Sequence, residues 1–561
     1  MAILNICIGG EFFGRMREEG RCYVDKTSFI EELLAPNQAL VSLFTRPRRF
    51  GKTLTMTMLQ EFFAIDKDSR SLFAGLVISD NVELCKKWMN QYPTLFLTFK
   101  GIEGKNFCEA VSFYRELVVR LCSDNEYLLD SNKVLKSDKD LLNRILSRTA
   151  DQIELMICLQ TLCHALEAYW NKPVILLIDE YDVPINCAEQ NGYYEEMVGF
   201  MRNMLGAALK TNTSLKFAVL TGCLRIAKES IFTGLNNFRC YGISEKQFSD
   251  KIGFTTQEVD KLLDSANLID KRALLREWYD GYRFGSVTEI YCPWDVLLYI
   301  DDLQSNPSAK PKAYWNNTSG NTIVRTLIDQ AQEETKQKIE RLISGKAIEE
   351  ELNEELTYDI VYQNENNIWT MLYLTGYLTK SAEQPDNGSV SLVIPNREVQ
   401  KIFINTISKW FNESLKGKDL SSFVVALWSG DNVKLQNTLT KILYSTISYY
   451  DSAENYYHGF MSGLIRGAGL PITSNRESGL GRTDITIEDG YHKRAVIIEL
   501  KYAKEYKDLK TKSQEGLKQI EDKNYIAGLS PQIQEVICYG ISFWRKESFV
   551  VVQKVRGCTG E

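Results

Sequence analysis

Residues 39–53 read ALVSLFTRPRRFGKT, and the helical pattern TLTMTMLQEFF continues from Thr53. The apolar run at 39–45 is typical of a short buried strand, and RPRRFGK (46–52) has the composition of a turn. In a strand–loop–helix unit of this kind, the helix start presents oriented backbone N–H groups that attract anions. The stretch therefore predicts an α/β fold with a phosphate-binding loop.

The second half of this stretch matches the phosphate-binding pattern GxxxxGK[ST]. Gly51 lets the backbone approach phosphate closely, Lys52 reaches the β- and γ-phosphates, and Thr53 binds Mg²⁺. The first glycine of the pattern is missing, because Arg46 occupies its place. The tripeptide GKT alone is a weak signal, so the rest of the chain has to support it.

Two later apolar strands supply that support. KPVILLIDE (172–180) ends in Asp179, which would hold Mg²⁺ through water, and Glu180, which would polarise the attacking water. SLKFAVLTG (214–222) brings Thr221 to the same edge as a sensor of the terminal phosphate, and Arg225 follows it. The alternative is an apolar strand that happens to end in acids, with a basic turn elsewhere.

Strands alternate with helical patterns through this part of the chain. A further apolar strand reads PTLFLTF (93–99), and helical periodicity covers 107–122, 151–170 and 193–210. Alternation of this kind predicts a parallel sheet with helices on both faces.

RPRRFGKT, LLIDEYDVPI and LTGCLRIAKESIFTGLNNF together resemble the bacterial AAA-ATPase-like proteins of the STAND-type P-loop NTPases. YVDKT and WYDGYRFG (278–285) also resemble blocks of that family, and the resemblance covers about 5–300. In that family RPRRFGK commonly replaces the glycine-first loop, and the resemblance implies ATP and Mg²⁺ as ligands. The implied nucleotide contacts are Arg46, Arg48, Arg49, Phe50, Gly51, Lys52, Thr53, Asp179, Thr221 and Arg225, with Thr53 and Asp179 at the metal.

A second constellation lies in GRTDITIEDGYHKRAVIIELKYAK (481–504). Alternation along AVIIELKYA puts Glu499 and Lys501 on one strand face and Leu500 in the core. A charged pair inside an apolar strand is costly unless something compensates its charges, and a metal ion would do so.

The spacing D–x14–ExK resembles the PD-(D/E)XK nuclease superfamily, although Thr483 stands where the motif's proline would be. The resemblance implies that Asp484 and Glu499 bind Mg²⁺ or Mn²⁺ and that Lys501 positions or deprotonates the attacking water. It also suggests two accessory residues, Glu454 as a metal ligand and Gln519 as a catalytic residue. The alternatives are a surface hairpin with a salt bridge, or the nuclease fold with its activity lost.

The composition limits the chemistry. Only 3 His stand among 561 residues, against 66 Lys+Arg and 73 Asp+Glu, so catalysis should rest on carboxylates, Lys and Arg. The 13 Cys are scattered singly, which favours reduced thiols over zinc or disulfides. The absence of a secretory leader or a long apolar run predicts a cytoplasmic protein without a membrane partner. A net charge of −7 requires any nucleic-acid groove to be local.

These inferences predict a multidomain α/β protein. Its parts are a P-loop ATPase domain (1–245), a helical or winged-helix lid (246–390), a helical linker (391–450) and a restriction-endonuclease-like αβββαβ domain (451–561). The leading hypothesis is an ATPase that gates Mg²⁺-dependent hydrolysis of DNA, with RNA a less favoured substrate and a homo-oligomer left open. The alternative is a STAND-like switch or scaffold whose C-terminal domain binds nucleic acid or a partner without cutting.

Overall fold

The chain divides into two compact units in the computed structural model. The first comprises Met1–Ser319, Glu350–Val390 and Pro395–Glu398, and the second comprises Gly320–Glu349, Ser391–Ile394 and Val399–Glu561. The structure describes residues 4–224, 238–315, 324, 333–353, 356, 365–415, 420–446, 454–478 and 481–556. The predicted limits of the four domains, and the winged-helix form of the lid, stay predictions.

A five-stranded sheet organises the first unit, with the strand order β2-β3-β4-β1-β5. All four strand pairs are parallel, which confirms the predicted sheet. Every residue of β1 and of β3 is buried, because helices cover both faces. The strands are β1 (Val41–Thr45), β2 (Thr94–Thr98), β3 (Val174–Asp179), β4 (Leu215–Gly222) and β5 (Phe238–Tyr241).

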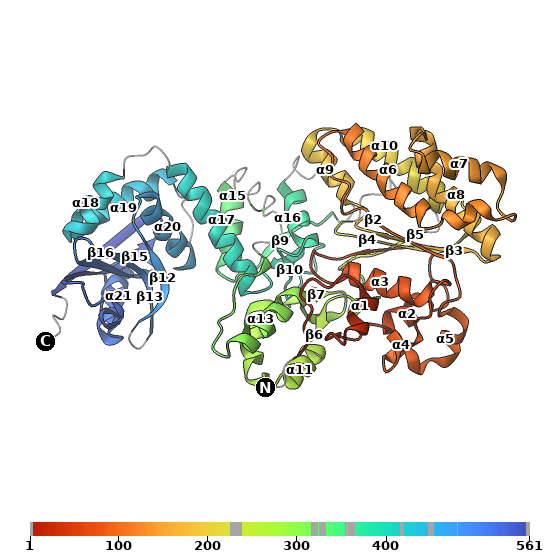
Figure 1. The fold of residues 1–561 in the computed structure, drawn as a ribbon. Helices are drawn as coiled ribbons and strands as arrows, with labels where there is room; N and C mark the ends of the chain where they lie inside the picture. The colour runs from red at the N-terminus through yellow and green to blue at the C-terminus, as the bar shows by residue number, and fades with distance from the viewer. Residues whose placement is uncertain are drawn as a thin grey trace. The chain divides into compact units, whose positions relative to one another are not determined.

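Helices form a layer on each side of this sheet. Figure 1 shows α6 to α10 on one side and α1 to α5 on the other. The first group is α6 (Phe107–Ser123), α7 (Lys136–Leu146), α8 (Gln152–Trp170), α9 (Val183–Asn191) and α10 (Tyr194–Leu209), with the 3-10 turn η2 (Glu126–Asp130). The second group is α1 (Phe13–Glu18), α2 (Ser28–Leu33), α3 (Lys52–Phe63), α4 (Arg70–Phe73) and α5 (Val82–Trp88), with η1 (Val77–Asp80).

The rest of the first unit is a smaller helical part around a three-stranded antiparallel sheet of order β6-β8-β7. Leu4, Ile6, Cys22 and Val24 of the N-terminal segment pack against its core, so that segment joins the two parts. The elements are β6 (Phe254–Thr255), α11 (Thr256–Ser265), η3 (Ile269–Lys271), α12 (Arg272–Tyr279), β7 (Tyr282–Phe284), β8 (Val287–Tyr291), α13 (Pro293–Ser305), α16 (Glu365–Leu374) and β10 (Thr379–Lys380).

A five-stranded mixed sheet of order β12-β13-β14-β15-β16 organises the second unit. β14 and β15 run parallel and the other pairs are antiparallel, which confirms the predicted helix, three strands, helix and further strands. The sheet and its helices are α20 (Glu454–Gly467), β12 (Thr473–Ser478), β13 (Gly481–Asp489), β14 (Arg494–Tyr502), η6 (Tyr506–Asp508), α21 (Leu509–Asp522), η7 (Tyr525–Gly528), β15 (Glu535–Trp544) and β16 (Glu547–Arg556). The elements before them are α15 (Glu333–Ile343), β9 (Ile348–Glu350), β11 (Val390–Val393), α17 (Arg397–Leu415), α18 (Ser421–Ser429) and α19 (Asn432–Thr446).

This second sheet carries a separate apolar core on each face. Val496, Ile498 and Leu500 of β14 pack in the larger core with residues of α18, α19 and α20. Ala495 and Ile497, which alternate with them, pack in the smaller core beneath α21. The side of β14 that ends in Glu499 and Lys501 is therefore the side that α21 covers.

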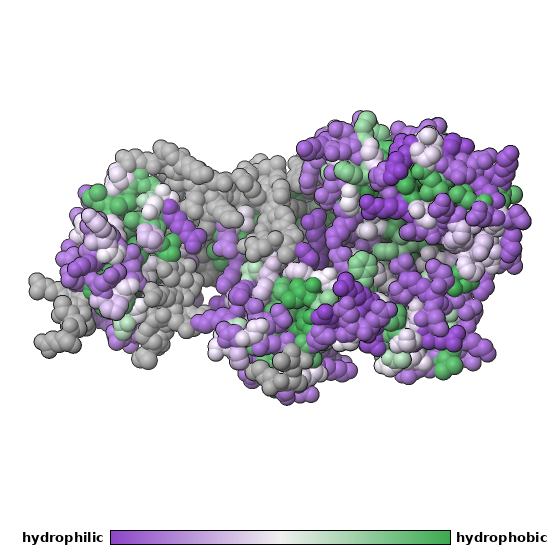
Figure 2. Space-filling view, viewed as in Figure 1, coloured by the Kyte–Doolittle hydropathy of each residue, from purple (hydrophilic) through white to green (hydrophobic). Residues whose placement is uncertain are grey.

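Hydrophilic side chains dominate the described surface in the view of Figure 2. Large exposed apolar side chains such as Ile153 and Leu135 come from separate helices or loops. Among the described helices, none has the length and the apolar character needed to cross a membrane.

Candidate functional site

Three elements of the first sheet meet at Asp179, the last residue of β3. Thr53 Oγ1 at the start of α3 donates to Asp179 Oδ2 over 2.7 Å. Thr221 Oγ1 at the end of β4 donates to Asp179 Oδ1. Asp179 is fully buried, and each of its carboxylate oxygens accepts a hydroxyl hydrogen. The structure thus brings together the loop threonine, the strand acid and the sensor threonine predicted from three separate stretches.

The loop before α3 holds its lysine against its own backbone. Lys52 Nζ donates to the carbonyl oxygens of Arg46 and Pro47, each over 3.0 Å. Gly51 caps α3 with φ 94°, a left-handed conformation that favours glycine, although open space surrounds the position of an added Cβ. The glycine is needed here for the backbone conformation, and its small size gives phosphate room to approach.

Arg46 has a structural role in place of the predicted nucleotide contact. It is fully buried, and its guanidinium donates to the carbonyl oxygens of Thr45, Tyr241 and Phe248. Burial lowers the pKa of Arg46 to about 10. Because a charged side chain without water needs such acceptors, Arg46 is committed to fastening β1 to β5. It lies outside the lining of the cavity.

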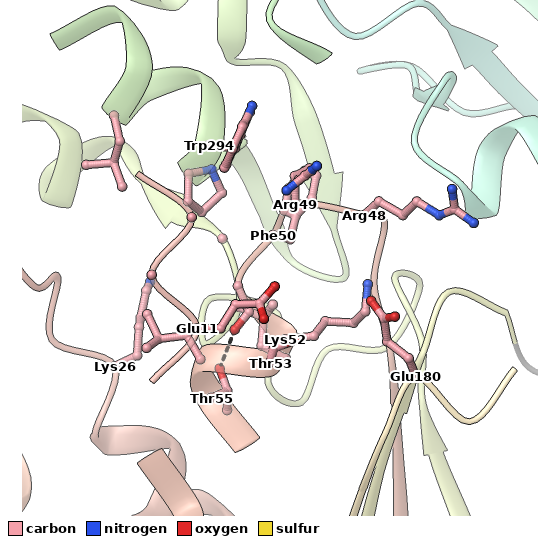
Figure 3. A pocket seen from close by; sticks show the side chains of 18 of the residues that line it. Glu11, Lys26, Arg48, Arg49, Phe50, Lys52, Thr53, Thr55, Glu180 and Trp294 are labelled. Carbon is pink, nitrogen blue, oxygen red and sulfur yellow. Dashed lines mark hydrogen bonds between the residues drawn. The ribbon is translucent and has the colours of Figure 1, made fainter. Parts of the chain in front are cut away.

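A cavity of about 350 Å³ opens beside the loop (Figure 3). Arg48, Arg49, Phe50, Gly51, Lys52, Thr53 and Glu180 all line it, which places seven predicted residues together. Asp179 and Thr221 lie outside its lining and are linked to it through Thr53. Arg225 falls outside the described residues.

Glu180 points toward Lys52 in Figure 3. Its backbone has φ 51°, a left-handed conformation that is strained for a residue with a side chain. Burial raises the pKa of the Glu180 carboxyl, while the charge of Lys52 opposes that rise. A carboxylate of this kind is suited to orienting a water molecule at the end of a phosphate chain.

Arg49 and Phe50 connect the loop to the smaller part of the first unit. The Arg49 guanidinium lies 4.2 Å from the centre of the Trp294 ring, at the start of α13. Phe50 packs edge-on against Tyr282 with ring centres 5.1 Å apart. These aromatic contacts fix the cavity wall opposite the sheet.

Other charged or aromatic residues, which the sequence did not point to as site residues, also line the cavity; they are Glu11, Tyr23, Lys26, Lys100, Glu103, Asp182, Lys251, Phe254 and Trp294. Lys26 belongs to the YVDKT block, so a signal existed for it. Its amine donates to Glu258 Oε2 over 2.6 Å, which joins the N-terminal segment to α11. Glu11 and Lys100 carry no local pattern, because only the fold brings them to the loop.

In the second unit, Asp484 and Glu499 lie on adjacent antiparallel strands. The register pairs Ile485 of β13 with Ile498 of β14. The next residue on each strand is one of the two acids, so Asp484 and Glu499 lie opposite each other. Asp484 Oδ2 accepts a hydrogen bond of 2.8 Å from the backbone N–H of Leu500. His458 on α20 lies 3.0 Å from the backbone oxygen of Asp484, a contact that sequence reasoning did not anticipate.

The helix α21 delivers Gln519 to the same acids. Gly516 of α21 lies close to the backbone of β14 and to Gly540 of β15; a Cβ added at Gly540 would lie 2.0 Å from Ser513 O. These glycines let the helix rest directly on the sheet. Gln519 Nε2 then donates to Glu499 Oε1 and, over 3.1 Å, to the hydroxyl of Tyr525. Tyr525 is a second residue that the sequence left unassigned.

Glu499 is the buried centre of this site. Lys501 Nζ donates to Glu499 Oε1 over 3.1 Å, as the strand alternation predicted for residues on one face. Glu499 Oε2 is buried and has no hydrogen-bond partner among the described residues. Burial, and then the charge of Asp484, raise the pKa of Glu499 to about 7. The site therefore holds more negative charge than its own donors satisfy.

A divalent cation that prefers oxygen ligands fits this excess of negative charge. The unpartnered Glu499 Oε2, the Asp484 carboxylate and the Leu500 carbonyl are ligands of the type that Mg²⁺ and Mn²⁺ accept, with water completing the shell. Within the described residues, no group of three His, Cys, Asp or Glu forms a metal cluster. Glu454 begins α20, but its side chain lies outside the described residues.

Comparison with known protein families finds a match for each of the two parts of the chain that carry these residues. Residues 7–232 match the family described as predicted AAA-ATPase, and residues 452–553 match the PD-(D/E)XK nuclease superfamily. The chain therefore carries an AAA-ATPase-like domain and, C-terminal to it, a domain of the nuclease superfamily.

One curated relative resembles the chain over nearly its whole length. It is the "Uncharacterized protein in vnfD 5'region" of Azotobacter chroococcum mcd 1, with 24% identity over 566 residues and 97% of each chain covered. The likeness spans both domains and the segment between them.

Proposed function

We propose that the protein binds and hydrolyses ATP and that its C-terminal domain is a Mg²⁺-dependent nuclease acting on DNA, gated by the nucleotide. The ATP site is supported by the hydrogen bonds that Thr53 and Thr221 donate to Asp179 next to the cavity. The buried, unpartnered oxygen of Glu499 carries the nuclease assignment.

At the ATP site, each residue has a distinct task. The N–H groups at the start of α3 and the amine of Lys52 receive the β- and γ-phosphates, once Lys52 leaves the carbonyls that now hold it. Thr53 and Asp179 would hold Mg²⁺, which neutralises phosphate charge when bound. Glu180 orients the water that attacks the terminal phosphate, and its elevated pKa helps it accept a proton.

At the nuclease site, Asp484 and Glu499 would hold Mg²⁺ or Mn²⁺, which acts as a Lewis acid on the phosphodiester when bound. Gln519 and Tyr525 fix the orientation of Glu499. The Lys501 amine, held by Glu499 Oε1, is placed to position or deprotonate the attacking water and to offset phosphate charge.

Exposed lysines on α21 and on the segment between β14 and α21 support a nucleic-acid substrate. Lys504, Lys510 and Lys518 are exposed and form no ion pair among the described residues. Lys507 and Lys512 are paired with Glu505 and Glu515, each over 2.6 Å. Three available lysines supply local attraction for a phosphate backbone despite the net charge of −7.

The direct test is nicking of supercoiled plasmid and of single-stranded DNA, with Mg²⁺, Mn²⁺ or EDTA, in the presence and absence of ATP. We expect nicking that requires the divalent metal and that changes in rate when ATP is added. Metal-independent nicking would contradict the assigned chemistry. No nicking under any metal, together with ATP binding in calorimetry, would favour the switch or scaffold over the nuclease.

A further inference from the structure

Protein oxygens hold two lysines of the ATP cavity. Lys52 rests on two carbonyl groups of its own loop. Lys100 donates to Glu11 Oε1 over 2.6 Å, and both side chains line the cavity. The Lys100 side chain is 56% exposed and that of Glu11 is 40% exposed, so an entering anion can reach either.

The strand register places Lys100 on the side of the cavity where Glu180 lies. Thr98 of β2 pairs with Asp179 of β3, and the Phe99 N–H donates to the Asp179 carbonyl over 2.9 Å. Lys100 and Glu180 therefore leave neighbouring parallel strands at the same edge of the sheet. The Glu11 hydrogen bond, and to a smaller extent the charge of Glu180, raise the pKa of Lys100. The Lys100 ammonium thus stands among carboxylates and keeps its proton.

The partner, Glu11, belongs to a segment that is fastened on both sides. Thr57 Oγ1 of α3 donates to the Glu11 carbonyl over 2.7 Å. Further upstream, the Leu4 N–H donates to Gln304 Oε1 over 2.5 Å, and the Gln304 amide donates back to the Leu4 carbonyl over 3.2 Å. Gln304 lies on α13, the helix that also carries Trp294 into the cavity. The segment that carries Glu11 is therefore attached to both α3 and α13, so a displacement of Glu11 pulls on both helices.

We propose that Lys100 binds the terminal phosphate of a nucleoside triphosphate, and that Glu11 competes with that phosphate for the Lys100 amine. The inference rests on the proposed ATP site and assigns to it a residue that reads the third phosphate. A phosphate with more than one negative charge attracts the ammonium more strongly than a single carboxylate does. Glu11, left beside that phosphate without its cation, is repelled and turns away.

The proposal distinguishes triphosphate from diphosphate. Lys52 serves the β- and γ-phosphates from the loop, whereas Lys100, which follows β2, adds a second cation for the terminal phosphate. A diphosphate leaves the Glu11–Lys100 pair intact, and a triphosphate breaks it. Residues 7–16, which carry Glu11, then report the presence of the third phosphate to the smaller part of the first unit.

Calorimetric titration of the full chain with ATP analogue and with ADP tests this assignment. In Lys100→Ala, the affinity for a non-hydrolysable ATP analogue should fall about tenfold or more, as loss of a charged hydrogen bond implies, while ADP affinity stays within about twofold. In Glu11→Gln, the competing charge is gone, so the analogue should bind a fewfold more tightly and ADP binding should not change. Lys67→Ala is the matched control, because Lys67 forms a 2.6 Å ion pair with Glu61 outside the cavity lining.

Hydrogen exchange of residues 7–16 gives a second readout. We expect faster exchange with the ATP analogue than with ADP in the unaltered protein, and no such difference in Lys100→Ala. Equal loss of both nucleotides in Lys100→Ala, or no loss of either, would overturn the role of Lys100. If the unaltered protein bound neither nucleotide, the proposed ATP site itself would be rejected.

Discussion

The cavity of the first unit, which is the proposed ATP site, and the acid site of the second unit contain the same residue types but differ in how their carboxylates are paired. Both combine two acids with a lysine, Asp179 and Glu180 with Lys52 in one and Asp484 and Glu499 with Lys501 in the other. Among the described residues, the Asp179 carboxylate accepts hydrogen bonds from the uncharged hydroxyls of Thr53 and Thr221. Glu499 forms a direct ion pair with Lys501 and still retains one buried oxygen without a partner.

The difference shows how burial decides what a carboxylate needs. Asp179 has a neutral donor for each oxygen and is preorganised before any ligand arrives. Glu499 is buried beside a second acid, and its raised pKa records the cost of that arrangement. The hydrogen bonds of the first site fix the position of its carboxylate without a ligand, whereas the negative charge of the second site is suited to a cation. Three variants test this difference between buried carboxylates.

The largest effect is expected at the acid site. Asp484→Asn removes one of the two negative charges that would hold the divalent ion, while its side-chain oxygen can still accept from Leu500 N–H. Metal-dependent DNA cleavage should fall by about 10³-fold or more, since metal and water activation supply several kcal/mol of barrier lowering. A gel assay of plasmid nicking measures the loss, with ATP binding expected to survive.

Glu505→Gln is the matched control for that variant. Glu505 pairs with Lys507 over 2.6 Å on the segment between β14 and α21, and surface pairs of this kind contribute little. Cleavage by this variant should stay within about twofold of the unaltered protein. Full cleavage by Asp484→Asn would remove Asp484 from the metal site.

A smaller effect is expected in the cavity. Lys52→Ala removes the charged donor to phosphate and should weaken ATP binding by about 10- to 100-fold, which corresponds to about 1.5–3 kcal/mol. Cleavage without ATP should not change, while its response to ATP should disappear. Calorimetry and nicking assays measure the two quantities, with Lys86→Ala, an exposed lysine of α5, as control. Unchanged ATP affinity would reject the phosphate-binding role of the loop.

The smallest effect, counted per pH unit, concerns a third pair of acids, Asp295 and Glu398, which are buried in the first unit and influence each other's pKa. Trp315 N–H donates to Glu398 Oε1 over 2.8 Å. Burial raises the pKa of Asp295 to about 6; burial, followed by the charge of Asp295, raises the pKa of Glu398 to about 10. This pair holds a proton where the acid site would hold a metal ion.

The sign of the resulting pH dependence follows from these shifts. Between the Asp295 pKa of about 6 and the Glu398 pKa of about 10, the folded state keeps a proton that the unfolded state releases. The free energy of unfolding should therefore fall as pH rises, by up to about 1.4 kcal/mol per pH unit for one proton. In Glu398→Gln the decline should flatten, as followed by thermal unfolding across this range. An equally steep decline in Glu398→Gln would assign the dependence to other groups.

Several features were predictable because they depend on neighbours in sequence. The alternation of AVIIELKYA predicted that Glu499 and Lys501 share a face while Leu500 enters the core, and the structure confirms both. Apolar strands ending in Asp179 and Thr221 predicted that their ends meet at one sheet edge. Strand period and the parallel arrangement fix such relations without any knowledge of distant contacts.

Other residues were assigned differently by the sequence and by the structure. Arg46 is adjacent in sequence to the phosphate loop, but its guanidinium donates hydrogen bonds to the carbonyls of Tyr241 and Phe248, about 200 positions away. Glu11 and Lys100 are 89 positions apart and still form one ion pair in the cavity. No local pattern distinguishes such side chains from ordinary surface charges.

By itself, the sequence determined the order of elements, the two sets of acids and lysine, and the two families that the chain resembles. Only the tertiary structure decided which charges are satisfied and which are not. Glu499 Oε2 is buried without a hydrogen-bond partner among the described residues, on the strand against which α21 packs closely through Gly516 and Gly540. Burial and hydrogen bonding are properties of surroundings assembled from distant segments, and these surroundings set the charge state on which both proposed chemistries depend.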